Sequence, residues 1–139
     1  MKFIPYSCQD ISADDVRSVC DALTSDFLTQ GPRSPAFEAA FAQRHEVDHA
    51  VAVTNATAGL HIACLALGVR AGSRVWTSPN SFVASANCAL YCGASIDFVD
   101  IDPHTRNMSL TALKAKLAAA EQTNSLPDVV IPVDFSGLP

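Results

Sequence analysis

The chain has 139 residues, of which 49% are hydrophobic and 17% charged, and its formal net charge is −5. This composition is typical of a globular domain that can bury a core, and it excludes a disordered chain. The sequence has no cluster of Lys and Arg and no apolar run of membrane-spanning length, so we expect no binding to nucleic acid or to a membrane. The N-terminus lacks the apolar segment of a secretory signal, which predicts a cytoplasmic protein.

The cysteines and histidines do not form a recognisable metal-binding pattern. The cysteines are Cys8, Cys20, Cys64, Cys88 and Cys92, an odd number without a C-x-x-C pair. Cys88 and Cys92 are one helical turn apart, so a metal pair is conceivable, but buried structural thiols are the favoured interpretation. No histidine has a partner at metal-ligand spacing, and we predict that the protein binds no metal.

A helix is predicted near the N-terminus. Ser12 is a typical N-cap, and Asp14 and Asp15 suit the first helical turn, so this helix is expected to extend to Leu23. Its apolar stripe consists of Val16, Val19, Cys20 and Leu23.

A turn-rich segment, residues 25–32, separates this helix from a second one. Ser34-Pro35 predicts the start of the second helix, with Pro35 at the first helical position. We expect Phe37, Ala40 and Phe41 to face inward.

From residue 50 onward, apolar strands alternate with helical runs. Strands are predicted at 50–54, 74–77, 95–99 and 129–133, and helices at 57–67, 82–92 and 110–121. Gly68 and Gly93 are the expected helix terminators. The order predicts an α/β fold, with a mainly parallel sheet covered by helices. We expect residues 1–48 to form an N-terminal arm with two helices, and residues 49–139 to form the repeating part.

The turn after the first predicted strand has the composition of an anion site. A helix N-terminus presents free N–H groups, Thr57 adds a hydroxyl, and the small residues Ala56, Ala58 and Gly59 permit close approach to the backbone. An ordinary turn with Thr57 as the N-cap is also compatible with this pattern. Neither a G-x-G-x-x-G motif nor a Walker A loop occurs, so a dinucleotide or P-loop site is not predicted.

Six segments, in the same order and spacing, resemble the sugar-nucleotide aminotransferases of the DegT/DnrJ/EryC1/StrS family, which use pyridoxal 5′-phosphate (PLP). The segments are Ile4–Tyr6, Asp26–Pro32, Asn55–His61, Thr77–Asn87, Phe98–Pro103 and Pro132–Gly137. The resemblance is greatest to the branch that aminates a UDP-4-keto-6-deoxy-sugar on the way to pseudaminic acid. It implies the N-terminal part of the large domain of the fold-type I PLP-dependent aminotransferases.

The resemblance also implies roles for individual residues. Thr57 and the Ala58 N–H are expected to bind the PLP phosphate, and Phe82 is expected to stack on the pyridine ring. The residues implied in substrate binding are Tyr6, Asp26, Phe27, Leu28, Thr29 and Ala56. From the residues alone, Phe82 is equally compatible with a core position at a helix start, Tyr6 with a half-buried surface position, and Phe27 and Leu28 with a hydrophobic staple.

A glutamate donor, a UDP-sugar substrate and a homodimer with active sites shared between its chains are implied as well. The family's Schiff-base lysine and the acid that pairs with the pyridine nitrogen are expected beyond residue 139. The lysines present are Lys2, Lys114 and Lys116, and we expect the last two to form a solvated helix face.

The 139-residue chain alone is therefore expected to be inactive, as a truncated product, a split reading frame or a fragment. A non-catalytic remnant that binds a nucleotide-sugar or a partner subunit, and a PLP-dependent sugar dehydratase, are the alternatives.

Overall fold

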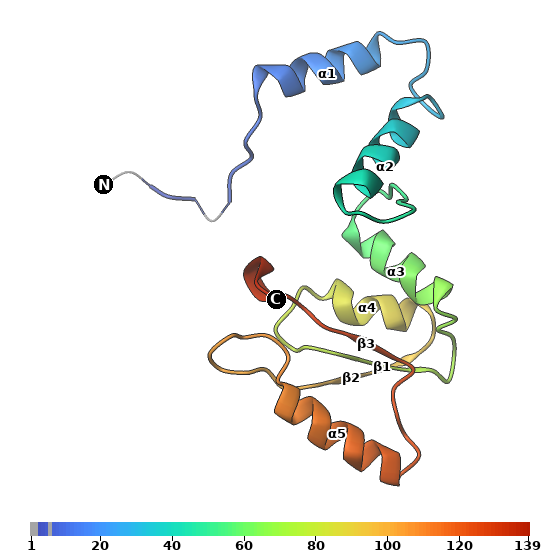
Figure 1. The fold of residues 1–139 in the computed structure, drawn as a ribbon, viewed down its shortest axis with the longest axis vertical. Helices are drawn as coiled ribbons and strands as arrows, with labels where there is room; N and C mark the ends of the chain where they lie inside the picture. The colour runs from blue at the N-terminus through green and yellow to red at the C-terminus, as the bar shows by residue number, and fades with distance from the viewer. Residues whose placement is uncertain (1–2, 6) are drawn as a thin grey trace. The chain divides into compact units, whose positions relative to one another are not determined.

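The computed structural model describes residues 3–5 and 7–139. The chain divides into two compact units, Met1–Ala52 and Val53–Pro139, and Figure 1 shows the elements of each. Within the described ranges, no helix is both long and apolar enough to cross a membrane.

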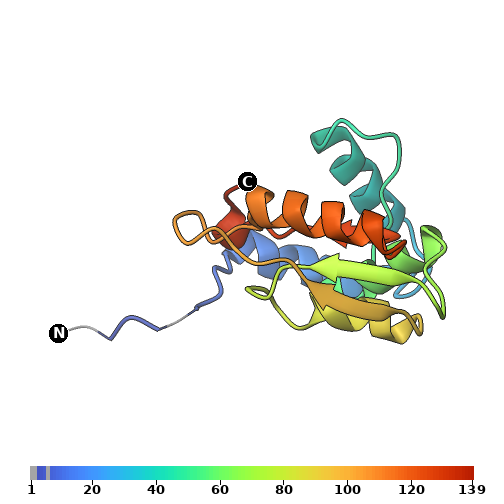
Figure 2. The same cartoon turned by 90° about the horizontal axis from the view of Figure 1, so that it is seen from below.

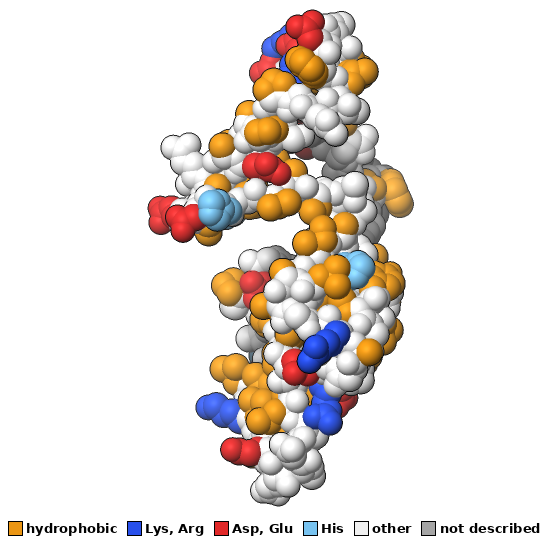
Figure 3. All heavy atoms as spheres, turned by 90° about the vertical axis from the view of Figure 1, so that its right-hand side faces the viewer, with side chains coloured by type: hydrophobic (Ala, Val, Ile, Leu, Met, Phe, Trp, Pro, Cys, Tyr) orange, Lys and Arg blue, Asp and Glu red, His pale blue; other side chains and the backbone are white. Residues whose placement is uncertain are grey.

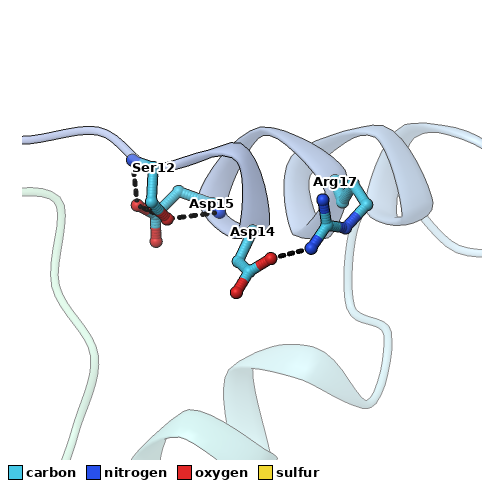
Figure 4. Close-up of polar contacts among 4 residues, drawn as sticks. All are labelled: Ser12, Asp14, Asp15 and Arg17. Atoms are coloured by element: carbon cyan, nitrogen blue, oxygen red, sulfur yellow. Dashed lines mark hydrogen bonds and ion pairs between the residues drawn. The ribbon is translucent and has the colours of Figure 1, made fainter.

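The first unit contains α1 (Ala13–Leu23) and α2 (Arg33–Arg44). Ser12 is the N-cap of α1, as the sequence predicts. Its N–H donates to Asp15 Oδ2 at 2.7 Å, and Ser12 Oγ accepts the Asp15 N–H at 3.2 Å, which completes a capping box. Figure 4 shows this box beside the ion pair between Asp14 and Arg17. The hydrogen bonds from the Ser12 backbone and side chain hold the pKa of Asp15 below its ordinary value.

The apolar side chains of this unit are more exposed than the sequence predicts. Phe37 and Phe41 are 59% and 48% exposed, and in α2 it is Ala42 that is buried. The predicted stripe of α1 is exposed as well, at Val16, Val19, Cys20 and Leu23. The inward orientation predicted for Phe37, Ala40 and Phe41 is therefore wrong, since Ala40 is exposed as well. An amphipathic pattern buries a stripe only where another layer packs on it.

The start of α2 also differs from the prediction. The helix begins at Arg33 after Pro32 as N-cap, so Pro35 occupies the third helical position. Proline is tolerated there because the first-turn N–H groups have no partner within the helix.

The second unit is an α/β layer structure. Its elements are α3 (Ala56–Ala66), β1 (Arg74–Thr77), α4 (Ala84–Tyr91), β2 (Ser95–Phe98), α5 (Leu110–Gln122), β3 (Val129–Ile131) and the 3₁₀ turn η1 (Phe135–Gly137). The strands form a parallel sheet in the order β2-β1-β3, with Val75 opposite both Ile96 and Val129. The predicted α/β fold with a parallel sheet is confirmed.

Alternation along the strands distributes the core over both faces of the sheet. Val75 belongs to a cluster with Cys64 of α3 and Cys88 of α4, whereas Trp76, the next residue, packs with Ala120 of α5. Figure 2 shows α5 on the face of the sheet opposite to α4. Hydrophobic side chains also reach the surface, as Figure 3 shows. Ile62 of α3 is 50% exposed.

The predicted strand at 50–54 is absent from the structure, where these residues pair with no described strand. The Ala52 N–H instead donates to Glu38 Oε1 at 2.8 Å. An apolar run becomes a strand only when a neighbouring strand satisfies its backbone, and composition alone does not supply that neighbour. The predicted helix at 82–92 begins two residues later, at Ala84. Gly68 and Gly93 end their helices with φ of 77° and 75°, as predicted.

Candidate functional site

The first turn of α3 contains three of the predicted site residues. Asn55 is the N-cap, with φ −169° and ψ 169°, and its Oδ1 accepts the Ala58 N–H at 2.9 Å. The Asn55 carbonyl accepts the Gly59 N–H at 3.1 Å. Thr57 therefore lies inside the helix, and the alternative in which it caps the turn is wrong.

Three donors of this turn remain free. Among residues 3–5 and 7–139, no group accepts a hydrogen bond from the N–H of Ala56 or Thr57, and the half-buried Thr57 hydroxyl has no partner either. These three groups lie at the positive end of the helix dipole, an arrangement suited to an anion. The Ala58 N–H, which the family resemblance assigns to the same anion, is already bonded to Asn55.

Phe82 lies in the connection between β1 and α4, and hydrogen bonds hold both ends of this connection. Thr77 and Ser78 are buried, and Thr77 Oγ1 donates to the Ile131 carbonyl at 2.9 Å, which ties β1 to β3. Ser81 Oγ and Ser85 Oγ are 2.6 Å apart, so the connection is also bonded to α4. Phe82 is 74% exposed, so the interpretation of Phe82 as a core residue is wrong.

Two hollows lie where the strands end, which is where ligands bind in sheets of this class. One, of about 630 Å³, is lined by residues including Asp102, Asn107 and Asp134. The other, of about 550 Å³, is lined by residues including Asn80 and Arg106.

A tight turn at Asp102 contributes residues to both hollows. Asp102 Oδ1 accepts the N–H groups of Thr105 at 3.1 Å and His104 at 2.8 Å. These bonds hold the pKa of the Asp102 carboxyl below its ordinary value.

The predicted substrate residues Asp26, Phe27, Leu28 and Thr29 lie in the first unit, between α1 and α2, and all four are exposed. A Cβ on Gly31 would lie 2.7 Å from Phe27 Cβ, so a glycine at this position keeps the segment compact. Tyr6 lies outside the described residues.

The two lysines of α5 have different environments. Lys114 is exposed, but Lys116 Nζ lies 2.7 Å from Asp97 Oδ2 and donates to the Phe98 carbonyl at 2.5 Å. The predicted solvated face is wrong for Lys116. The charged Asp97 within a predicted strand signals an interaction in the sequence but does not identify Lys116 as its partner.

The thiols of the second unit belong to its core. Cys64 and Cys88 are buried and Cys92 is half-buried, as the favoured interpretation of these cysteines predicts. Burial, and then a hydrogen bond with Cys88, raise the pKa of Cys64 to about 11. No group of three His, Cys, Asp or Glu side chains in the described part of the chain could hold a metal ion.

Comparison with known proteins identifies the family. The model of the DegT/DnrJ/EryC1/StrS aminotransferase family matches residues 9–139. The Spore coat polysaccharide biosynthesis protein SpsC of Bacillus subtilis is 38% identical over 135 residues, which are 97% of this chain and 33% of SpsC.

Solved structures agree with this match. The putative sugar aminotransferase Spr1654 of Streptococcus pneumoniae, in its PLP form, superimposes with a TM-score of 0.85 and 26% identity, over 98% of this chain and 33% of that one. The sugar aminotransferase CalS13 of Micromonospora echinospora gives a TM-score of 0.76 and 32% identity, over 99% of this chain and 36% of that one. The chain thus spans about a third of the length of these relatives. Because the family model matches nearly the whole sequence, the chain belongs to the DegT/DnrJ/EryC1/StrS aminotransferase family.

Proposed function

We propose that this chain forms part of a PLP-dependent aminotransferase that transfers an amino group from glutamate to a UDP-4-keto-6-deoxy-sugar, in the branch that leads to pseudaminic acid. Membership of the family supports the reaction class. The similarity to SpsC supports a sugar of a surface polysaccharide, and PLP- and PMP-forms of Spr1654 support the cofactor.

The first turn of α3 carries this proposal. The N–H groups of Ala56 and Thr57 and the Thr57 hydroxyl are free, and together they fit the phosphate of PLP. The Ala58 N–H joins them only by exchanging its bond with Asn55 Oδ1 for a bond with the phosphate. Since the helix dipole favours an anion over a neutral amide, this exchange is favourable.

Phe82 is the residue proposed to orient the ring of the cofactor. Its side chain is 74% exposed and follows a connection that is tied down by the Ser81–Ser85 pair. An aromatic ring in this position can stack on a planar ligand, which contributes about 0.5–1.5 kcal/mol beyond burial. When bound, PLP would supply the electron sink that lets the amino group move between donor and acceptor.

The sugar-nucleotide is proposed to contact Tyr6, Ala56 and the segment from Asp26 to Thr29. A homodimer in the cytoplasm is part of the same proposal. We propose that the lysine that forms the Schiff base with PLP is supplied from outside this chain. Lys116 is bonded to Asp97 and Phe98, and Lys114 is exposed on α5.

The phosphate assignment is tested with Thr57→Val in the complete protein that contains this chain. Removing the hydroxyl should weaken PLP binding by about 1.5–3 kcal/mol, the typical worth of a hydrogen bond to a charged group. Thr57→Ser is the matched control and should retain most of the affinity. Equilibrium dialysis with PLP and with pyridoxal, which lacks the phosphate, separates the phosphate contact from other losses. Equal affinity of parent and Thr57→Val for PLP would remove Thr57 from the site.

The reaction is tested separately. The complete protein, incubated with PLP, glutamate and a UDP-4-keto-6-deoxy-sugar, should yield the 4-amino sugar and 2-oxoglutarate. A product that has lost a hydroxyl but gained no amino group would indicate the dehydratase instead. PLP binding without any product would favour the non-catalytic alternative.

A further inference from the structure

Strand β2 lies at an edge of the sheet, and its backbone shows which of its groups face outward. The N–H groups of Ser95 and Val99 donate to the carbonyls of Ser73 and Thr77, both at 2.9 Å. Successive residues of a parallel strand direct their backbone groups to opposite sides. The backbone N–H and C=O of the intervening residue Phe98 therefore point away from β1, toward the open edge.

Both outward groups of Phe98 are nevertheless satisfied by side chains. Its N–H donates to Asp97 Oδ1 at 2.8 Å, and its carbonyl accepts from Lys116 Nζ at 2.5 Å. Asp97 Oδ2 and Lys116 Nζ are themselves 2.7 Å apart. The two side chains thus form a closed hydrogen-bonded ring across the position where a neighbouring strand would bind.

Helix α5, which packs on the sheet, anchors this hydrogen-bonded ring through Lys116. The Lys116 side chain comes from α5, is 27% exposed, and holds its ammonium group 4.8 Å from the centre of the Trp76 ring. Trp76 is buried between the sheet and α5, so the lysine stem has a fixed support. The hydrogen bond from Lys116 also holds the pKa of Asp97 below its ordinary value, so the carboxylate keeps its charge further into acid.

We propose that Asp97 and Lys116 close the β2 edge of the sheet against pairing with a further strand. An incoming strand would have to break both bonds to Phe98 and separate the ion pair between Asp97 and Lys116. Charged side chains that point into an edge are a known means of preventing intermolecular strand pairing. Pairing of a further strand at β2 is consequently disfavoured.

Lys116→Met in the 139-residue chain tests this inference. Methionine retains a flexible apolar stem on Trp76 but loses the ammonium group, so the Phe98 carbonyl becomes free. Lys114→Met removes the same charge two residues away on the exposed side of α5, and is the matched control. The measurements are sedimentation velocity and residue-resolved amide hydrogen exchange, at low and at high protein concentration.

The outward-facing amide of Ile96 is the decisive probe, because an added strand at β2 would protect it. In Lys116→Met its exchange should slow several-fold at high concentration, together with the appearance of larger species. In the parent and in Lys114→Met its exchange should not depend on concentration, even if the chain associates through another surface. An Ile96 exchange rate in Lys116→Met that does not change with concentration would overturn the proposal.

Two further variants keep the test decisive. If Lys116→Met fails to fold, as judged by circular dichroism, Asp97→Ala replaces it, since Asp97 is 61% exposed and contributes little packing. The exchanged pair Asp97→Lys/Lys116→Asp preserves net charge, but the ammonium group that it introduces on β2 has no oxygen to accept the Phe98 N–H. If the bonds to Phe98 block the edge, this double variant should associate as Lys116→Met does. If the changed net charge caused the association of Lys116→Met, the double variant should not associate.

Discussion

The side-chain oxygen of Asn107 accepts the backbone N–H of Phe135 at 2.8 Å. The amide nitrogen of the same side chain donates to the Leu138 carbonyl at 2.8 Å. A single residue, in the loop before α5, thus holds both ends of the turn that follows β3. Asp134 lies directly before this turn and lines the larger of the two hollows.

Loss of this clamp should release the turn after β3 without unfolding the sheet. In Asn107→Ala both hydrogen bonds are lost, at a cost of about 0.5–1.5 kcal/mol each. Hydrogen exchange at Phe135 should therefore accelerate, while the amides of β1 remain protected. Asn107→Asp is the control, because it keeps the oxygen that accepts from Phe135 and loses only the donor to Leu138. Equal exchange of Phe135 in parent and Asn107→Ala would contradict the assigned role.

Phe82→Leu should separate cofactor binding from stability. Because Phe82 is 74% exposed, its replacement should change the free energy of unfolding by less than about 0.5 kcal/mol. The proposed stacking partner of PLP is lost, so PLP affinity should fall, whereas Phe82→Tyr should retain it. Urea unfolding and equilibrium dialysis are the two measurements. A large loss of stability with unchanged PLP affinity would show that the ring has a structural role only.

The cysteines should differ sharply in reactivity. Cys64 is buried, and its pKa is raised to about 11, whereas Cys8 and Cys20 are exposed. Because only the thiolate reacts, the native chain should be alkylated by iodoacetamide at Cys8 and Cys20 and remain unmodified at Cys64 under mildly alkaline conditions. Peptide mass spectrometry measures the three sites, and unfolding in urea should expose Cys64 as the positive control. Rapid native modification of Cys64 would indicate that the packing between α3 and α4 opens readily.

The Asp97–Lys116 pair predicts a dependence of stability on pH. The folded-state pKa of Asp97 lies below its unfolded value of about 3.9, so the pair stabilises the fold above that pH. This contribution is lost as pH falls through the folded-state pKa. The difference in unfolding free energy between the parent and Asp97→Asn should accordingly be constant near neutral pH and shrink in acid. A difference that grows in acid would mean that the sign of the pKa shift is wrong.

The repeating part of the chain could be predicted from the sequence because its signals are local. Apolar runs bounded by glycine locate β1 and β2, and helix terminators such as Gly68 need only a positive φ. The predicted strand at 50–54 failed for the opposite reason. A strand depends on a partner that can be distant in the sequence, and the apolar run contains no information on that partner.

The candidate site was predicted in part. The small residues and Thr57 after residue 54 indicated an anion-binding turn, and the structure leaves two N–H groups free there. The competition of Asn55 for the Ala58 N–H could have been anticipated from the preference of asparagine for the N-cap. The environment of Lys116 could not have been anticipated in this way. The position of a lysine on a helix does not reveal which carbonyl of a neighbouring strand its side chain meets.

Trp76 is the chain's single tryptophan, and the alternation of β1 places it entirely on the α5 side of the sheet. Intrinsic tryptophan fluorescence therefore reports on one core cluster and is insensitive to the other, which is built from Cys64, Val75 and Cys88. Detachment of α5 would shift the emission while the α3–α4 layer is still intact. The unlabelled protein thus carries an optical probe that distinguishes the opening of one face of its sheet from the opening of the other.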